Sequence, residues 1–178
     1  MKVWTEDPMR SIHKMLNPRS IAVVGATPSG GYGGRLLGAV LRSKDRIRVY
    51  PVNPKYHEIM GATCYPSVAA MPEAPDLVGI VVPHHKVLEV LRECHQKKAG
   101  SAVIISAGFA ERATDAGRES QRQLAAFARE SCLRIAGPNC LGVANVRDDI
   151  WATASSRTLG GLTGPIGLVC QSGATAFG

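Results

Sequence analysis

Short apolar runs rich in β-branched residues recur along the chain, and the stretches between them carry apolar residues at helical spacing. The strand candidates are 20–25, 47–52, 77–82, 102–106, a weaker 133–136, and 166–170. The helical stripes are Leu37, Val40 and Leu41; Val87, Val90, Leu91 and Cys94; and, more weakly, Gln121, Leu124, Ala128 and Ser131. Nearly continuous apolar strands alternating with helices are typical of a parallel sheet covered on both faces. The pattern therefore predicts an α/β fold, a Rossmann-like doubly wound parallel sheet.

Changes in composition divide the chain into unequal parts. Residues 1–146 hold most of the predicted elements, and within them 61–75, rich in Gly, Pro and Ala, predict an irregular crossover with one short helix. Periodicity disappears after residue 146, so 147–163 are expected to be a linker. Residues 164–178 combine a fresh strand with a small-residue turn, which predicts the start of a second, flavodoxin-like α/β unit that is truncated.

The 178 residues are 45% hydrophobic and 20% charged, which suits one globular domain. No apolar run approaches the ~20 residues of a membrane helix, and the first residues lack the apolar core of a secretory signal. The five cysteines are dispersed without a C-x-x-C pair, which argues against a zinc site and a disulfide framework. We therefore expect a cytoplasmic protein that binds no membrane.

The net charge is +7, and residues 1–60 contribute +6 of it, from ten Lys and Arg against four Asp and Glu. Either a polyanionic partner or a solvated basic face would explain this excess. Nucleic acid is not expected to be the partner, because aromatic residues are sparse and no helix-turn-helix, RRM or zinc-finger signature is present.

The strongest local signal is the sequence VVGATPSGGYGGRLL at residues 23–37, where a predicted strand meets a glycine-rich loop and then an amphipathic helix. Glycines allow close backbone approach, and the amides of a helix start favour a phosphate. The dinucleotide fingerprint is absent because Leu36 stands where its last glycine would be, and no G-K-[ST] of a P-loop follows. A tight turn without a ligand is the alternative.

The end of the second predicted strand distinguishes between nucleotides. An NAD-binding domain places Asp or Glu there to bond the ribose hydroxyl, whereas this chain has Asn53 and, two residues on, Lys55. A cation at this place favours a ribose that carries a phosphate, as in NADP or coenzyme A (CoA). Alternatively, Lys55 is a solvated lysine in a turn.

Three further loops follow predicted strands, at 82–85, 106–111 and 137–142, and we expect them to share one crevice with the glycine-rich loop. His84 and His85 are expected to be exposed in the first turn of a helix. The other histidines are dispersed, so we predict no metal site. A hydrolase is not indicated either, because the sequence contains no G-x-S-x-G motif.

Five ordered runs, at 17–26, 50–55, 104–109, 137–142 and 171–173, together resemble one family. The chain is similar, from about residue 12 to its end, to the CoA-binding domain of NDP-forming acyl-CoA synthetases (acetate–CoA ligases), which are relatives of the succinyl-CoA synthetase alpha subunit. Two departures stand out: Cys170 replaces the serine usual before Gln-Ser-Gly, and His84-His85 replace small residues that follow Val-Pro.

The resemblance implies a set of CoA-binding residues. In the family the loop matching 27–33 holds CoA phosphates, the lysine matching Lys55 lies near the nucleotide, and the turns at 82–83 and 106–108 line the groove. The segment matching 139–140 lies near the pantetheine thiol, with Cys140 as a small packing residue. The implied residues are Thr27, Pro28, Ser29, Gly30, Gly31, Tyr32, Gly33, Asn53, Lys55, Val82, Pro83, Ser106, Ala107, Gly108, Asn139 and Cys140.

The resemblance also implies a reaction. Family members convert acid, CoA and NTP to acyl-CoA, NDP and phosphate through an acyl phosphate and a phosphohistidine. That histidine lies downstream of the motif matched by 171–173, so no catalytic residue is expected in this chain, and turnover is not expected from it alone. Nucleotide and Mg²⁺ would be handled by an ATP-grasp module, in cis or as a separate subunit. The sequence leaves open whether the chain forms a homo-oligomer.

Two other functions remain as alternatives. The chain could be a stand-alone CoA-binding regulatory module or subunit, although an unfinished second unit argues against that. An NADP-dependent oxidoreductase is the less favoured alternative, and it predicts that NADPH binds in preference to CoA.

Overall fold

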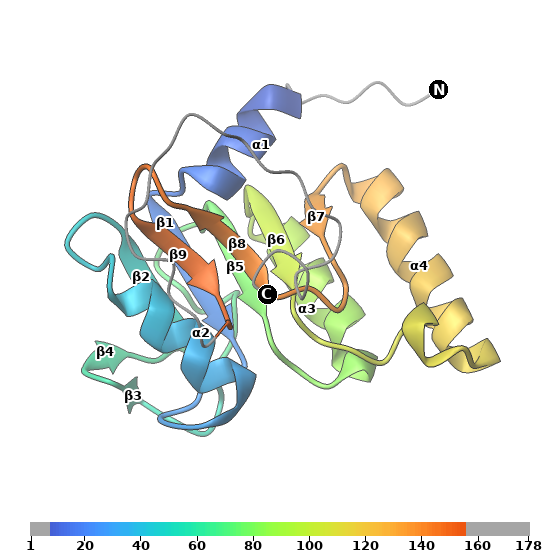
Figure 1. Cartoon of the computed structure of the whole chain (residues 1–178), viewed down its shortest axis with the longest axis horizontal. Helices are drawn as coiled ribbons and strands as arrows, with labels where there is room; N and C mark the ends of the chain where they lie inside the picture. The colour runs from blue at the N-terminus through green and yellow to red at the C-terminus, as the bar shows by residue number, and fades with distance from the viewer. Residues whose placement is uncertain (1–7, 156–178) are drawn as a thin grey trace.

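A five-stranded parallel sheet forms the centre of the protein, of which the computed structural model describes residues 8–155 (Figure 1). The sheet order is β2 (Arg48–Val52), β1 (Ser20–Val24), β5 (Leu77–Ile80), β6 (Ser101–Ile104) and β7 (Arg134–Ala136). All four neighbouring pairs are parallel. The chain starts at β1, moves outward to β2, and then returns to build β5, β6 and β7 on the other side. This reversal is the doubly wound topology, so the predicted α/β fold is confirmed.

Helices cover both faces of the sheet, as Figure 1 shows. Helices α1 (Pro8–Leu16) and α2 (Gly31–Leu41) lie on one face, and α3 (His84–Gln96) and α4 (Asp115–Ser131) on the other. Successive strand residues point to opposite faces. Leu77 accordingly packs in the cluster that contains Leu36 of α2, and Val78 in the cluster that contains Leu91 of α3. Each of the three stripes of helical period lies on one of these helices.

A short antiparallel hairpin completes the α2 face. Its strands are β8 (Gly142–Asn145) and β9 (Ile150–Thr153), and it packs against α2. Ile150 and Ala152 are buried in the cluster that holds Leu37 and Val40 of α2. A strand thus occupies the first part of the segment 147–163 that we expected to be a linker, because three consecutive apolar side chains there become buried. The rest of that segment, and the unit expected at 164–178, lie outside the described residues.

The crossover between β2 and β5 differs from the prediction. It contains a small hairpin, β3 (Glu58–Ile59) and β4 (Ala62–Thr63), and the short helix expected within 61–75 was wrong. Side chains of α3 and of Lys97, the residue that follows it, hold this segment instead of helical backbone bonds. The Glu93 carboxylate accepts from the Val68 amide at 3.1 Å, and Lys97 Nζ donates to the Met71 carbonyl at 2.5 Å.

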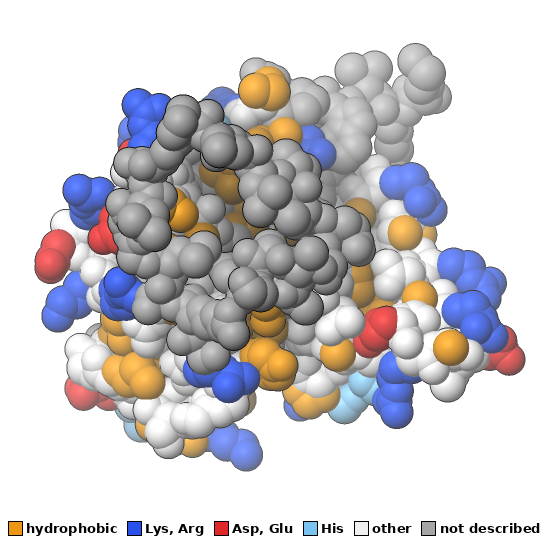
Figure 2. Space-filling view, viewed as in Figure 1, with side chains coloured by type: hydrophobic (Ala, Val, Ile, Leu, Met, Phe, Trp, Pro, Cys, Tyr) orange, Lys and Arg blue, Asp and Glu red, His pale blue; other side chains and the backbone are white. Residues whose placement is uncertain are grey.

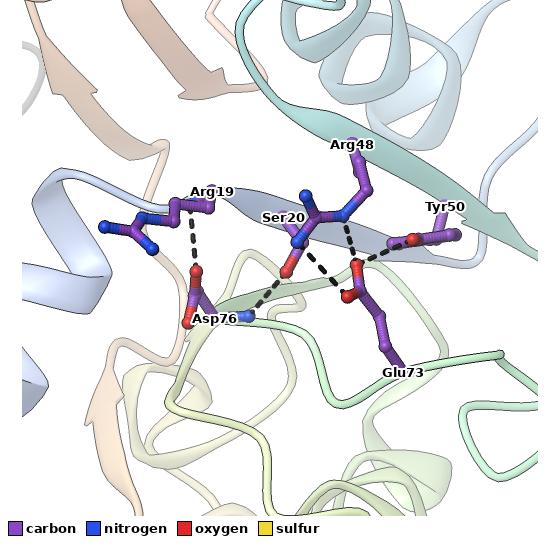
Figure 3. Close-up of polar contacts among 6 residues, drawn as sticks. All are labelled: Arg19, Ser20, Arg48, Tyr50, Glu73 and Asp76. Atoms are coloured by element: carbon purple, nitrogen blue, oxygen red, sulfur yellow. Dashed lines mark hydrogen bonds and ion pairs between the residues drawn. The ribbon is translucent and has the colours of Figure 1, made fainter.

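Polar side chains tie the crossover to the amino ends of the strands (Figure 3). Glu73 accepts from Arg48 Nε at 2.5 Å and from the Tyr50 hydroxyl at 2.7 Å. Asp76 accepts from the Arg19 amide at 2.9 Å, just before β1. The amino edge of the sheet is therefore closed by a hydrogen-bonded network, whereas the carboxyl edge carries the loops described next.

Candidate functional site

The loops singled out in the sequence all leave the carboxyl ends of the parallel strands. The glycine-rich loop follows β1, residues 53–55 follow β2, 82–83 follow β5, 106–108 follow β6, and 139–140 follow β7. In parallel α/β sheets, ligands bind at this edge, where the strand order reverses. Here that point lies between β1 and β5.

A cavity of about 390 Å³ opens at that point, between the ends of β1, β2 and β5 and the first turns of α3. Its size falls within the range of small-molecule sites. Valine and proline side chains from five segments form most of its wall: Val24, Val52, Pro54, Pro66, Val68, Val81, Val82, Pro83 and Val90. Such an apolar lining suits an aromatic ring rather than a fully polar ligand.

Two lysines reach this cavity from opposite sides, Lys55 after β2 and Lys86 in the first turn of α3. Glu89 and Glu93 of α3 line it as well. Lys86 was missed in the sequence analysis. Its spacing to residues 89, 90 and 93 places all four on one face of a helix, and that signal could have identified it once α3 was assigned.

The glycine-rich loop allows the start of α2 to lie against the end of β1. Gly25 has φ +86, and a Cβ there would lie 2.1 Å from the Val81 carbonyl oxygen. A Cβ on Gly33 would lie 2.2 Å from the carbonyl oxygen of Gly25. Helix α2 begins at Gly31 after Gly30, without a side-chain cap. Its first amides lack intrahelical partners and carry a partial positive charge, which is the arrangement that attracts phosphate.

Asn53 joins the two parts of the site. Its Nδ2 donates to the carbonyl of Ala26 in the glycine-rich loop at 2.8 Å, and its Oδ1 accepts from the Lys55 amide at 3.0 Å. Asn53 therefore lines the cavity and also fixes the loop that carries Lys55. A carboxylate at this position could not donate to the Ala26 carbonyl.

The remaining predicted residues lie further along the same edge and outside this cavity. The Ser106 hydroxyl donates to the Val82 carbonyl at 2.6 Å and accepts from the Val82 amide at 3.1 Å. The Asn139 amide donates to the Ser106 carbonyl at 3.0 Å. The loops after β5, β6 and β7 are thus joined in a row. Of the predicted residues, Asn53, Lys55, Val82 and Pro83 line the cavity, residues 27–33 form the glycine-rich loop without lining it, and the others lie along the edge.

Cys140 packs at the end of that row. Its thiol donates to the Ile104 carbonyl, with 3.4 Å between sulfur and oxygen. Burial raises the pKa of Cys140, so the thiol stays protonated near neutral pH. A protonated, partly buried thiol is a poor nucleophile, and the geometry is that of a packing residue.

His84 and His85 begin α3, as expected, but only His85 is exposed, and His84 is half-buried. The His84 ring lies against Gly108, where a Cβ would come within 2.8 Å of its Cγ, and it meets the Phe109 ring edge-on at 6.4 Å between centroids. Both histidines face a hollow of about 350 Å³ between α3 and α4, which is separate from the cavity that holds the lysines.

Lys and Arg side chains are spread over the surface, as Figure 2 shows for one face, and those of the first third of the chain make separate contacts. Arg48 pairs with Glu73 at the amino edge, Arg46 donates to the carbonyl of Asp148, and Arg42 stacks on Trp151. Among the basic residues that the structure describes in this third, Lys55 alone lines the cavity. Most of this charge therefore belongs to a solvated surface rather than to the site.

Within residues 8–155 no group of three or more His, Cys, Asp and Glu side chains is placed to hold a metal ion. Over the same range, no helix is long and apolar enough to span a membrane.

The chain is similar in sequence to known CoA-binding proteins. A family described as CoA binding domain matches residues 19–146. The ADP-forming acetate–CoA ligase I of Archaeoglobus fulgidus is 39% identical over 163 residues, which are 92% of this chain and 23% of that protein. The alpha subunit of ADP-forming acetate–CoA ligase II of Pyrococcus furiosus is 36% identical, over 91% of this chain and 35% of the subunit.

A solved structure supports the same relationship. The dinucleotide-forming acetyl-coenzyme A synthetase 1 of Ca. Korarchaeum cryptofilum, in complex with phosphate and ADP, superposes with a TM-score of 0.74 and 34% identity. The alignment covers 80% of this chain and 30% of that one. The chain thus spans about a quarter to a third of the length of these relatives.

Proposed function

The chain belongs to the family of CoA-binding domains, and on that premise we propose that coenzyme A binds at the carboxyl edge of its sheet, between the glycine-rich loop and α3. The observation that carries this proposal is the cavity itself. It combines an apolar wall of Val and Pro with two lysines, directly beside a loop whose backbone amides are available to phosphate.

The residues present fit the chemistry of CoA. The adenine ring suits the Val and Pro wall, and the ribose 3′-phosphate suits Lys55 and Lys86. The pyrophosphate would lie on the loop of residues 27–33, where a Cβ on Gly30 or Gly31 would meet nothing within 4 Å, so the backbone there is open to a ligand. Glu89 and Glu93 give the same cavity carboxylates that accept from ring amino groups.

The pantetheine arm would follow the row of loops away from the nucleotide. It would pass 82–83 and 106–108 and place its thiol near 139–140. From β1 to β7 there are three inter-strand spacings, about 15 Å in all, a distance comparable with an extended pantetheine arm. This direction explains why the predicted residues divide between the cavity and the edge beyond it.

We further propose that the chain is the CoA-binding part of an ADP-forming acyl-CoA synthetase. Its share of the reaction is to hold CoA with the thiol presented at the edge of the sheet. The activation of the acid and the nucleotide chemistry, with NTP and Mg²⁺ in an ATP-grasp module, would belong to other parts of such an enzyme, in cis or on a separate subunit. Two observations support this division of work between parts of an enzyme. The relatives are about three to four times as long as the part that matches this chain, and one of them is an alpha subunit.

Isothermal titration calorimetry with CoA, dephospho-CoA and NADPH tests the binding proposal. We expect CoA to bind more tightly than dephospho-CoA. Lys55→Ala and Lys86→Ala should each lower the affinity for CoA about tenfold, because each removes one charge-assisted contact. Lys44→Ala, an exposed lysine beyond the far end of α2, is the matched control and should bind as the unmodified chain does. Equal affinity for CoA and dephospho-CoA would contradict the role of the lysines, and preference for NADPH would contradict the choice of ligand.

A further inference from the structure

An exposed aromatic side chain stands at the start of α2, beside the glycine-rich loop. Tyr32 is 51% exposed, although large apolar rings are normally buried. The guanidinium carbon of Arg35 lies over this ring, 4.6 Å from its centroid. The pair is one helical turn apart, so stacking and helix spacing together hold both side chains at the mouth of the loop.

The guanidinium leans toward the N-terminal end of α2, because it lies over the ring of Tyr32, and it meets no carboxylate in the described part of the chain. Side chains on a helix lean toward its N-terminus, which for α2 is the phosphate-binding end of the loop. Helix α2 contains no acidic residue. Arg48, Arg118 and Arg122 each pair with a carboxylate, whereas residues 8–155 contain no ion pair that involves Arg35.

We propose that Arg35, held in place by the ring of Tyr32, is a further cation of the coenzyme site and binds the pyrophosphate. This inference rests on the proposed function. CoA carries two separate anionic groups, and the two lysines of the cavity account for one of them. The pyrophosphate is the other, and backbone amides alone would leave much of its charge uncompensated. A planar guanidinium bonds two phosphate oxygens at once, and stacking on a ring leaves its N–H edge available for that contact.

The same helix offers a matched control at its other end. The guanidinium of Arg42 lies over the ring of Trp151, 5.6 Å from its centroid, where α2 meets the β8–β9 hairpin. The contact is of the same type, but it lies at the end of α2 away from the glycine-rich loop. Removing this charge changes the net charge of the chain equally without touching the proposed site.

Calorimetric titration of Arg35→Gln and Arg42→Gln with CoA and with dephospho-CoA tests the proposal, and thermal melting checks that each variant folds. We expect Arg35→Gln to lower the affinity for both ligands about tenfold, because both carry the pyrophosphate. Lys55→Ala should weaken CoA only, and Arg42→Gln should change neither affinity. Tyr32→Ala removes the ring that holds Arg35 and should weaken CoA binding, though by less than Arg35→Gln does, whereas Tyr32→Phe keeps the ring and should lose less affinity than Tyr32→Ala.

The outcomes separate the two proposals. Equal affinities for Arg35→Gln and the unmodified chain would overturn the role of Arg35 and leave the CoA site intact. A loss confined to CoA would place Arg35 on the 3′-phosphate and overturn the assignment to the pyrophosphate. Absence of CoA binding in the unmodified, folded chain would instead refute the proposed function.

Discussion

Replacing Gly33 by alanine tests whether the backbone of the glycine-rich loop is as close to the strand as the structure indicates. Gly33 lies in the first turn of α2, and its added Cβ would lie 2.2 Å from the carbonyl oxygen of Gly25, where real contacts essentially never come under 3.0 Å. The neighbouring atom belongs to the backbone and cannot rotate away. The start of the helix and the end of β1 must therefore separate.

The magnitude follows from two opposing contributions. Alanine in place of glycine stabilises a helix by about 1 kcal/mol. Overpacking against a rigid neighbour costs about 1–3 kcal/mol, so Gly33→Ala should lower the free energy of unfolding by up to about 2 kcal/mol. For a domain of this size that corresponds to roughly 2–4 °C in Tm per kcal/mol. Displacement of the loop should also lower the affinity for CoA by more than tenfold.

Gly38 provides the control in the same helix. A Cβ there meets nothing within 4 Å, so Gly38→Ala should gain the helix contribution without the overlap and raise the free energy of unfolding by about 1 kcal/mol. Thermal and urea unfolding, followed by circular dichroism, and CoA titration by calorimetry are the assays. If Gly33→Ala were as stable as Gly38→Ala and bound CoA normally, the close approach that defines the loop would be refuted.

Three further substitutions test the contacts around the site and at the opposite edge. Asn53→Ala removes the bridge between the loops and should weaken CoA about fivefold while lowering the free energy of unfolding by about 1 kcal/mol, measured by calorimetry and urea unfolding. Ser106→Ala leaves the Val82 amide without its side-chain acceptor and should cost about 1–3 kcal/mol in the same unfolding assay; no loss would contradict the link between these loops. Hydrogen bonding to Arg48 lowers the pKa of Glu73 below its ordinary 4.5, so the carboxylate stabilises the fold above that pH and the contribution is lost as the pH falls through the lowered value. Glu73→Gln should therefore cost up to about 1 kcal/mol at pH 7 and progressively less below pH 4.5 in unfolding curves, and a constant difference would contradict this.

The central sheet could be predicted from the sequence because its strands are buried on both faces. Every residue of β1, β5 and β6 is buried, which produces short continuous apolar runs that few other structures require. The glycine-rich loop was recognisable for a related reason, since close backbone approach restricts the side chains that fit. The common edge then followed from the parallel topology alone.

The elements missed are those whose burial depends on tertiary contacts. In α1 the apolar residues Met9, Ile12, Met15 and Leu16 do fall at helical spacing, but of these four only Met15 is buried, and the sequence analysis did not assign the helix. The strand β9 is short, and its apolar residues matter only because α2 lies against them. Lys86 faces the cavity because of the way α3 is rotated about its axis, and 30 residues separate it from Lys55 along the chain. Local periodicity alone shows neither the packing of β9 against α2 nor the meeting of Lys86 and Lys55 at one cavity.

A crystal structure of the chain with bound CoA tests the central claim most directly. We predict the 3′-phosphate at Lys55 and Lys86, the pyrophosphate on the amides of residues 31–33, and the thiol near Cys140. Density for CoA at the amino edge of the sheet, or a nucleotide in the reverse orientation with its thiol among the Val and Pro side chains, would contradict it.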